Sequence, residues 1–265
     1  MKTRMVRVRR AAPVRRLTAL LVLALAAFLW VSLRRGDPVA AILSARDAER
    51  VTSDVVFQAL SLHAVRTAVC DSEEAARVEA ARYAPRGAAG YVLRREEWHV
   101  LAAGYDTAEE ADAVRGRLRA EEGMTCDTVS LVCGPVRIRV TATAEQTAAL
   151  TGCEKALRET AGLTAALSRA VDGGDTAVSQ AIGALKAQRA ALEEARTRLA
   201  SAAGEAPDDR VCGPLLAMAA EAVNKLDRLT GAQATLPAVL FSGRMKALFL
   251  ALRVAQIDYL AALGG

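Results

Sequence analysis

Side chains able to carry out catalysis or bind a metal are sparse in this chain of 265 residues. His63 and His99 are its only histidines, and its five cysteines include no Cys-x-x-Cys pair. Neither the Ser, His and Asp order of a nucleophilic triad nor a glycine-rich phosphate loop is present. Gly173-Gly174 is better explained as a turn between two helices. These residue types predict a protein that is not an enzyme and uses no metal or cofactor.

Polar side chains that could bind a ligand lie on two stretches that read as extended strands, residues 62–70 and 98–105. In a strand, successive side chains point to opposite faces of the sheet. One predicted face packs against helices and carries Val65, Thr67, Val69, Trp98, Val100 and Ala102. The other, open face carries Ala64, Arg66, Ala68, Glu97, His99, Leu101 and Ala103. Arg66 and His99 would supply hydrogen-bonding groups on a partly apolar surface, which suits a sugar ligand.

Two repeats of strand, helix and strand, within residues 62–131, must position these side chains. Each helix is expected to start at a polar capping residue, Asp71 or Ser72 for the first and Asp106 or Thr107 for the second. Glutamates after each cap suit the positive end of the helix dipole. Short extended pieces at residues 89–93 and 125–131 complete the two halves. Right-handed crossovers then predict a four-stranded βαββαβ sheet with both helices on one face.

This stretch resembles the SPOR (sporulation-related) domain. Residues 63–70 align with the aromatic-x-Val-Gln-x-Gly-x-Phe strand of that family, and residues 98–105 with its aromatic-Arg-Val-x-x-Gly-Pro-Phe strand. Residues 87–92 look like its second strand. Four positions depart from the pattern: Arg66 replaces Gln, Ala68 replaces Gly, Cys70 replaces Phe and His99 replaces Arg.

The resemblance implies a small ferredoxin-like module that binds peptidoglycan. SPOR domains prefer glycan strands stripped of their stem peptides, usually at the division septum. The candidate glycan-binding residues lie at or beside the motif positions: Arg66, Ala68, Val69, Glu97 and His99. An RNA-binding βαββαβ sheet is a poorer interpretation, because the open face of the central strands lacks aromatic side chains for stacking.

The net charge of +5 is unevenly distributed. Residues 1–35 carry nine Lys and Arg and no acid, so the remaining 230 residues hold 26 basic and 30 acidic side chains. The basic character therefore belongs to an N-terminal flank, and the rest of the chain is mildly acidic. This distribution argues against a nucleic acid as the partner.

An uncharged run rich in Leu and Ala, residues 17–33, is long enough to cross a bilayer as a helix. Seven basic residues precede it and two follow it directly, so the positive-inside rule predicts that residues 1–16 are cytoplasmic and the later domains extracytoplasmic. Residues 34–61 are expected to form a stalk. The alternative is a cleaved signal peptide with Val39-Ala40-Ala41 as its cleavage signal. The length of the apolar run and the two arginines that end it favour an uncleaved membrane anchor.

After a predicted edge strand at residues 136–140, which completes a SPOR-like domain at residues 62–140, helical periodicity dominates residues 143–265. Thr143 and Gln146 form a capping box at its start. Four amphipathic helices with short loops predict an antiparallel four-helix bundle, and hence an α+β protein. The last helix is apolar on more than one face, which is typical of a central bundle helix. A second membrane span is disfavoured because charged residues interrupt it: Arg244, Lys246, Arg253 and Asp258.

Two functional hypotheses follow. In the first, a single-pass membrane protein binds peptidoglycan through its SPOR-like domain, in cell division or sporulation, while the bundle contacts partner proteins. In the second, the chain is a non-catalytic envelope scaffold in which a degenerate SPOR domain only positions a partner-binding bundle.

Cys70 and Cys126 are expected to lie close together, because the end of the first strand meets the start of the fourth in a 4-1-3-2 sheet. Outside the cytoplasm, neighbouring thiols oxidise when their geometry permits it. A disulfide is one alternative, and two small buried free thiols are the other. The odd count of five cysteines argues against a full disulfide framework.

Overall fold

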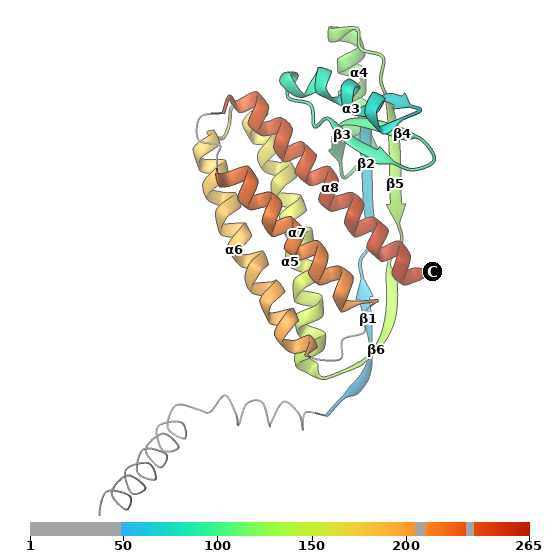
Figure 1. The fold of residues 1–265 in the computed structure, drawn as a ribbon, viewed down its shortest axis with the longest axis vertical. Helices are drawn as coiled ribbons and strands as arrows, with labels where there is room; N and C mark the ends of the chain where they lie inside the picture. The colour runs from blue at the N-terminus through green and yellow to red at the C-terminus, as the bar shows by residue number, and fades with distance from the viewer. Residues whose placement is uncertain (1–48, 205–209, 232–235) are drawn as a thin grey trace, which may run out of the picture. The chain divides into compact units, whose positions relative to one another are not determined.

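The computed structural model describes residues 49–204, 210–231 and 236–265, and Figure 1 shows their arrangement. The predicted cytoplasmic segment, the membrane anchor and residues 34–48 of the stalk lie outside the described residues. Residues 50–265 form one compact unit. In the described part, the chain is an α+β protein with six α-helices and two antiparallel sheets, which confirms the predicted fold class at this level.

The larger sheet has four antiparallel strands in the order β3-β4-β2-β5. Its strands are β2 (Leu60–Cys70), β3 (Tyr91–Arg94), β4 (Trp98–Tyr105) and β5 (Asp127–Cys133). Helix α3 (Glu73–Tyr83) follows β2, and helix α4 (Ala108–Glu122) follows β4. A short 3-10 turn, η1 (Ala84–Arg86), continues α3.

Both predicted helix starts are confirmed. The Ser72 hydroxyl accepts a hydrogen bond from the Ala75 N–H, and the Thr107 hydroxyl accepts one from the Glu110 N–H. Each cap is followed by two glutamates in the first helical turn. These starts follow from local sequence, because the capping side chain and the backbone N–H that donates to it are three residues apart.

A second, two-stranded sheet joins β1 (Val51–Phe57) to β6 (Val136–Ala142). The predicted strand at residues 136–140 is confirmed, with basic side chains exposed between less exposed apolar ones. Residues 51–61, however, were expected to belong to the stalk, and they form β1 and the start of β2 instead. Val55 and Phe57 are buried on the core side of β1, which ties this segment to the rest of the fold.

Four long helices form the bundle: α5 (Ala144–Asp172), α6 (Val178–Ala203), α7 (Cys212–Gly231) and α8 (Ala238–Gly264). The capping box of Thr143 and Gln146 is present at the start of α5. Helix α5 packs against α6 and α8, while α7 packs mainly against α6.

Helix α8 belongs to the bundle and also covers the four-stranded sheet (Figure 1). One hydrophobic core runs through both, so side chains of β2 and β4 share it with α5 and α8. By length and composition α8 could cross a membrane. In the fold its apolar residues contact the bundle on one side and the sheet on the other, which explains why they occur on more than one face.

Three of the four charged residues that interrupt α8 fasten it to its neighbours. The Lys246 ammonium donates to the Gly87 carbonyl at 2.9 Å and pairs with Asp172 at 2.6 Å. The Arg253 guanidinium, 6% exposed, donates to Asp106 at 2.8 Å, and Asp258 pairs with Arg95 at 2.7 Å. These three residues therefore connect α8 to the sheet loops and to α5.

All five cysteines, each within the described residues, are free thiols, so the disulfide considered for Cys70 and Cys126 is not formed. The pairing of β2 with β5 ends at Arg66 and Asp127, and Cys70 pairs instead with Trp98 of β4. Cys126 is buried, and its thiol lies 3.8 Å from the Arg115 carbonyl oxygen. The expected position of Cys126 opposite the end of β2 was wrong because β2 continues beyond the start of β5.

Candidate functional site

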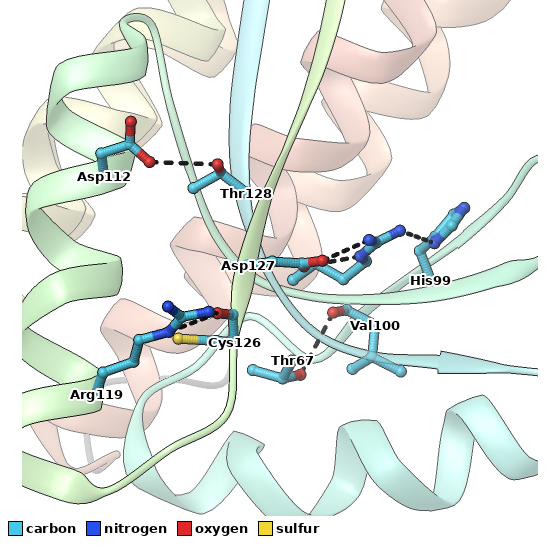
Figure 2. A network of polar contacts seen from close by, with 9 residues as sticks. Thr67, His99, Val100, Asp112, Arg119, Cys126, Asp127 and Thr128 are labelled. Atoms are coloured by element: carbon cyan, nitrogen blue, oxygen red, sulfur yellow. Dashed lines mark hydrogen bonds and ion pairs between the residues drawn. The ribbon is translucent and has the colours of Figure 1, made fainter.

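The most connected polar group on the sheet is centred on Arg66. Its Nε donates to Asp127 Oδ1 at 2.9 Å, and its Nη2 donates to Asp127 Oδ2 at 2.5 Å. Its Nη1 lies 3.0 Å from His99 Nδ1. In Figure 2, the unlabelled side chain joined by dashed lines to both His99 and Asp127 is Arg66. Arg66 thus bridges β4 and β5 across the middle strand β2.

Strand pairing brings these residues together. Arg66 and Asp127 are register partners at the end of the β2–β5 ladder, so their side chains lie on the same face. His99 lies two residues before Leu101 on β4, and Leu101 is the register partner of Arg66. The expected common face for Arg66 and His99 is therefore present, and Asp127 adds a carboxylate that the sequence analysis did not select.

The electrostatics of this group favours an ion pair between Arg66 and Asp127 and a neutral His99. The hydrogen bond from Arg66 lowers the pKa of Asp127, and the hydrogen bond to Asp127 raises the pKa of Arg66. Burial lowers the pKa of His99, and the charge of Arg66 lowers it further. Because a guanidinium only donates, His99 Nδ1 accepts, which leaves the ring proton on Nε2.

Most of the face that was expected to be open is covered by α8. Ala64 and Leu101 are 1% and 0% exposed and belong to the core shared with α8. A Cβ added at Gly104 of β4 would lie 2.6 Å from a Leu250 methyl carbon of α8, which shows how closely the two elements approach. The end of this face that carries Arg66, His99 and Asp127 is not covered by α8.

Two irregularities in the pairing of β2 with β4 change the predicted faces. Val65 pairs with Ala103 and Arg66 with Leu101, and the register shifts again before Ala68. Each such bulge exchanges the faces that the following residues occupy. Ala68 therefore packs against the cluster that α3 buries, whereas Val69 is 43% exposed. The prediction that Ala68 is open and Val69 faces the helices was wrong on both counts.

The remaining candidate, Glu97, is exposed just before β4. The charge of Glu97 raises the pKa of His99, whereas the charge of Arg66 lowers it. Glu97 and Val69 therefore flank the Arg66 group, whereas Ala68 does not belong to it.

A shallow cavity of about 240 Å³ adjoins the Arg66 group, between β2 and the start of β5. Arg119 of α4 closes one side of it and donates two hydrogen bonds to the Cys126 carbonyl oxygen, at 3.0 and 2.6 Å. Figure 2 also shows a hydrogen bond from Thr128 to Asp112 and one from Thr67 to the Val100 carbonyl. The Arg119 and Thr128 contacts hold the start of β5 against α4, and the Thr67 contact joins β2 to β4.

The chemistry of this arrangement suits binding. In the described ranges, no group of three or more His, Cys, Asp and Glu is placed to hold a metal ion. Asp127 and His99 engage three of the five N–H groups of Arg66, so its two other N–H groups, His99 Nε2 and the Asp127 lone pairs are the groups available to a ligand. Hydroxyl or amide groups could bind there.

No protein-family profile, no curated protein and no solved structure matches this chain. The SPOR resemblance therefore stays a prediction from the residues themselves.

Proposed function

We propose that this chain is a non-catalytic scaffold of the cell envelope. A degenerate SPOR-like, ferredoxin-like sheet serves as the base on which a partner-binding helical bundle is built. An N-terminal helix at residues 17–33 anchors the chain in the cell membrane, with the N-terminus in the cytoplasm and the sheet and bundle outside. The protein acts within a division or sporulation complex and binds no nucleic acid.

The observation that carries this proposal is the position of α8. A glycan strand needs several sugar units of uncovered sheet surface, and α8 fills most of the corresponding face with Phe249, Leu250 and their neighbours. The contact is close and polar as well as apolar, because Lys246, Arg253 and Asp258 are all paired across it. A surface buried in this way supports the bundle and is not available to a ligand.

The βαββαβ order and the antiparallel strand order β3-β4-β2-β5 support the SPOR-like assignment of the sheet. The proposed membrane anchor rests on composition, since it lies outside the described residues. The absence of catalysis rests on the sparse inventory of nucleophiles and histidines in the sequence.

A pull-down on purified cell-wall sacculi tests the proposal. The purified protein should not be retained on sacculi, whether or not an amidase has first removed the stem peptides. Retention that increases after amidase treatment would contradict the scaffold proposal and support glycan binding.

Glycan binding at the uncovered end of the sheet is the second candidate. The observation in its favour is the polar group of Arg66, His99 and Asp127, which lies beside the exposed side chain of Val69. A single sugar could stack on the valine and bond to His99 and Asp127. Under this alternative, Arg66→Ala combined with His99→Ala should abolish retention on sacculi while the circular dichroism spectrum is unchanged. The matched control is Arg137→Ala, an exposed arginine on β6.

A further inference from the structure

A groove with an apolar floor lies between α7 and α8. It has the features of a docking site, whereas most of the sheet face is covered. It encloses about 320 Å³ and is bounded by α7, α8 and Tyr91 of β3. Its floor is apolar, with Leu229 of α7 opposite Leu248 and Ala251 of α8. The groove exists because α7 packs mainly on α6, while α8 packs mainly on α5 and the sheet.

Three cations surround this apolar floor. Lys225 and Arg228 come from α7 and Arg244 comes from α8, and none of the residues that line the groove is acidic. Helical spacing directs two of them to the groove, since Lys225 lies one turn before Leu229 and Arg244 lies one turn before Leu248. The α7–α8 groove is therefore an apolar channel with a positive rim on both helices.

Nearby acids are already engaged elsewhere. Asp227 of α7 pairs with Arg189 of α6 at 3.0 Å, and Asp258 of α8 pairs with Arg95. Lys225 has a loose partner, Glu221, at 3.6 Å. Within the described residues, Arg228 and Arg244 have no ion pair or hydrogen bond, although the other three charges that interrupt α8 are all paired. Unpaired arginines beside buried leucines favour a negatively charged occupant.

The geometry selects the kind of occupant. Two helices that flank an apolar floor present a groove into which a third helix packs with its own apolar stripe. The N-terminal segment of this chain is a poor occupant, because residues 1–35 carry nine Lys and Arg and no acid. A flat anionic bilayer would contact the exposed rim and leave the recessed floor unfilled.

We infer that the α7–α8 groove is the docking site for an amphipathic helix of a partner protein, whose apolar stripe is flanked by Asp and Glu. This inference rests on the proposed scaffold function, because it names the surface and the partner chemistry through which the bundle acts. The partner helix places leucine-sized side chains between Leu229 and Leu248 and its carboxylates on Arg228, Arg244 and Lys225.

The test uses the full chain and a defined probe. The probe is a fluorescent 18-residue helical peptide with leucine at i, i+3, i+4 and i+7 and glutamate at the flanking positions, about five turns long. Its binding is followed by fluorescence anisotropy at about 0.05 M and about 0.5 M salt. The control probe has lysine in place of every glutamate.

The glutamate peptide should bind the unmodified protein, and more weakly at the higher salt concentration. Arg228→Gln with Arg244→Gln should weaken binding about fivefold or more, since each exposed ion pair contributes modestly. Ala251→Trp, at a half-buried position in the groove, should block binding without removing a charge. The matched control, Arg169→Gln with Lys186→Gln, neutralises two exposed cations of the bundle outside the groove and should leave binding unchanged.

Several outcomes would overturn the inference. These are no binding of the glutamate peptide, equal binding of the lysine peptide, or equal binding by the Arg228 and Arg244 variant. Vesicles of anionic lipid that bind the protein through these arginines, when the peptide does not, would identify a membrane-facing surface. Self-association that the same variant abolishes would identify a second copy of the chain as the occupant.

Failure of this inference and failure of the scaffold proposal remain distinguishable. Retention on sacculi contradicts the scaffold proposal whatever the peptide does. Absence of peptide binding, together with no retention on sacculi, contradicts only the inference that the α7–α8 groove is a docking site.

Discussion

At the scale of single residues, the Arg66 group shows how one side chain sets the protonation states of its neighbours. Arg66 holds Asp127 ionised and disfavours a second positive charge on His99. A histidine whose pKa is lowered by folding stabilises the fold above its unfolded pKa of about 6.5, and this contribution is lost as the pH falls. An aspartate with a lowered pKa acts in the same direction, below about pH 4.

We expect the free energy of unfolding to fall as the pH drops from about 7.5 to about 5.5, in part through His99. His99→Gln should reduce this pH dependence, because glutamine accepts from Arg66 without titrating. Urea titrations of both proteins at the two pH values measure the effect. An identical pH dependence in the variant would show that His99 is not the group that titrates. Asp127→Asn should change the pH dependence of the free energy of unfolding only below about pH 4.

Gln256 offers a second test at this scale. Its side chain is 3% exposed, and neither its oxygen nor its nitrogen has a hydrogen-bond partner among the described residues. An unsatisfied buried amide costs about 1–3 kcal/mol, so Gln256→Leu should raise the free energy of unfolding by about 1 kcal/mol or more.

Gln188 is the matched control for that substitution. Its amide donates to the Thr160 hydroxyl at 3.0 Å, so Gln188→Leu should lower the free energy of unfolding by about 1 kcal/mol. Thermal unfolding of both variants provides the comparison. Destabilisation by Gln256→Leu would mean that the amide of Gln256 is satisfied after all.

At the scale of elements, close packing of α8 on the sheet loops depends on Gly243. A Cβ at this position would lie 2.9 Å from the Ala88 carbonyl oxygen and 3.2 Å from the Gly87 carbonyl carbon, both of them backbone atoms. Backbone cannot move aside as the end of a side chain can. The small residue is therefore what allows the helix to approach the turn after η1.

Gly243→Ala should accordingly lower the free energy of unfolding by about 1–3 kcal/mol, through a forced shift of α8. Gly183→Ala in the second turn of α6, where nothing lies within 4 Å of the added Cβ, should instead stabilise the protein by about 0.5–1 kcal/mol. Urea unfolding of the two variants distinguishes packing from helix propensity. Equal stabilisation in both would show that α8 does not approach the turn this closely.

At the scale of the whole molecule, the shared core predicts that the sheet and the bundle unfold together. Leu62 and Leu101 of the sheet and Phe249 of α8 belong to the same buried cluster. Separating the sheet from the bundle would expose the apolar face of α8 that packs on the sheet. The part of the chain from residue 50 onward should therefore behave as one cooperative unit.

Trp98 of β4 reports on the sheet, and far-ultraviolet circular dichroism reports mainly on the helices. In a Trp30→Phe variant, which leaves Trp98 as the one tryptophan, urea unfolding followed by both signals should give the same midpoint. Two separate midpoints would show that the sheet is an independent domain, as a free SPOR module would be.

Much of this fold could be read from the sequence, because the deciding interactions are local. The caps at Ser72 and Thr107, the capping box of Thr143 and Gln146, and the glycine-containing breaks between helices each involve residues only a few positions apart. Apolar periodicity located the four bundle helices for the same reason. The shared face of Arg66 and His99 followed from the alternation of strands.

What only the tertiary structure decided involves contacts between distant residues. No local pattern marks the bulges that turn Ala68 inward and Val69 outward, or the partnership of Arg66 with Asp127, 61 residues away. An apolar helix such as α8 is compatible with a bundle core, a membrane or a sheet face, since composition specifies burial but not the partner that buries it. The fold placed α8 on the sheet because β2 and β4 present Leu62, Leu101 and Gly104 as a complementary apolar surface.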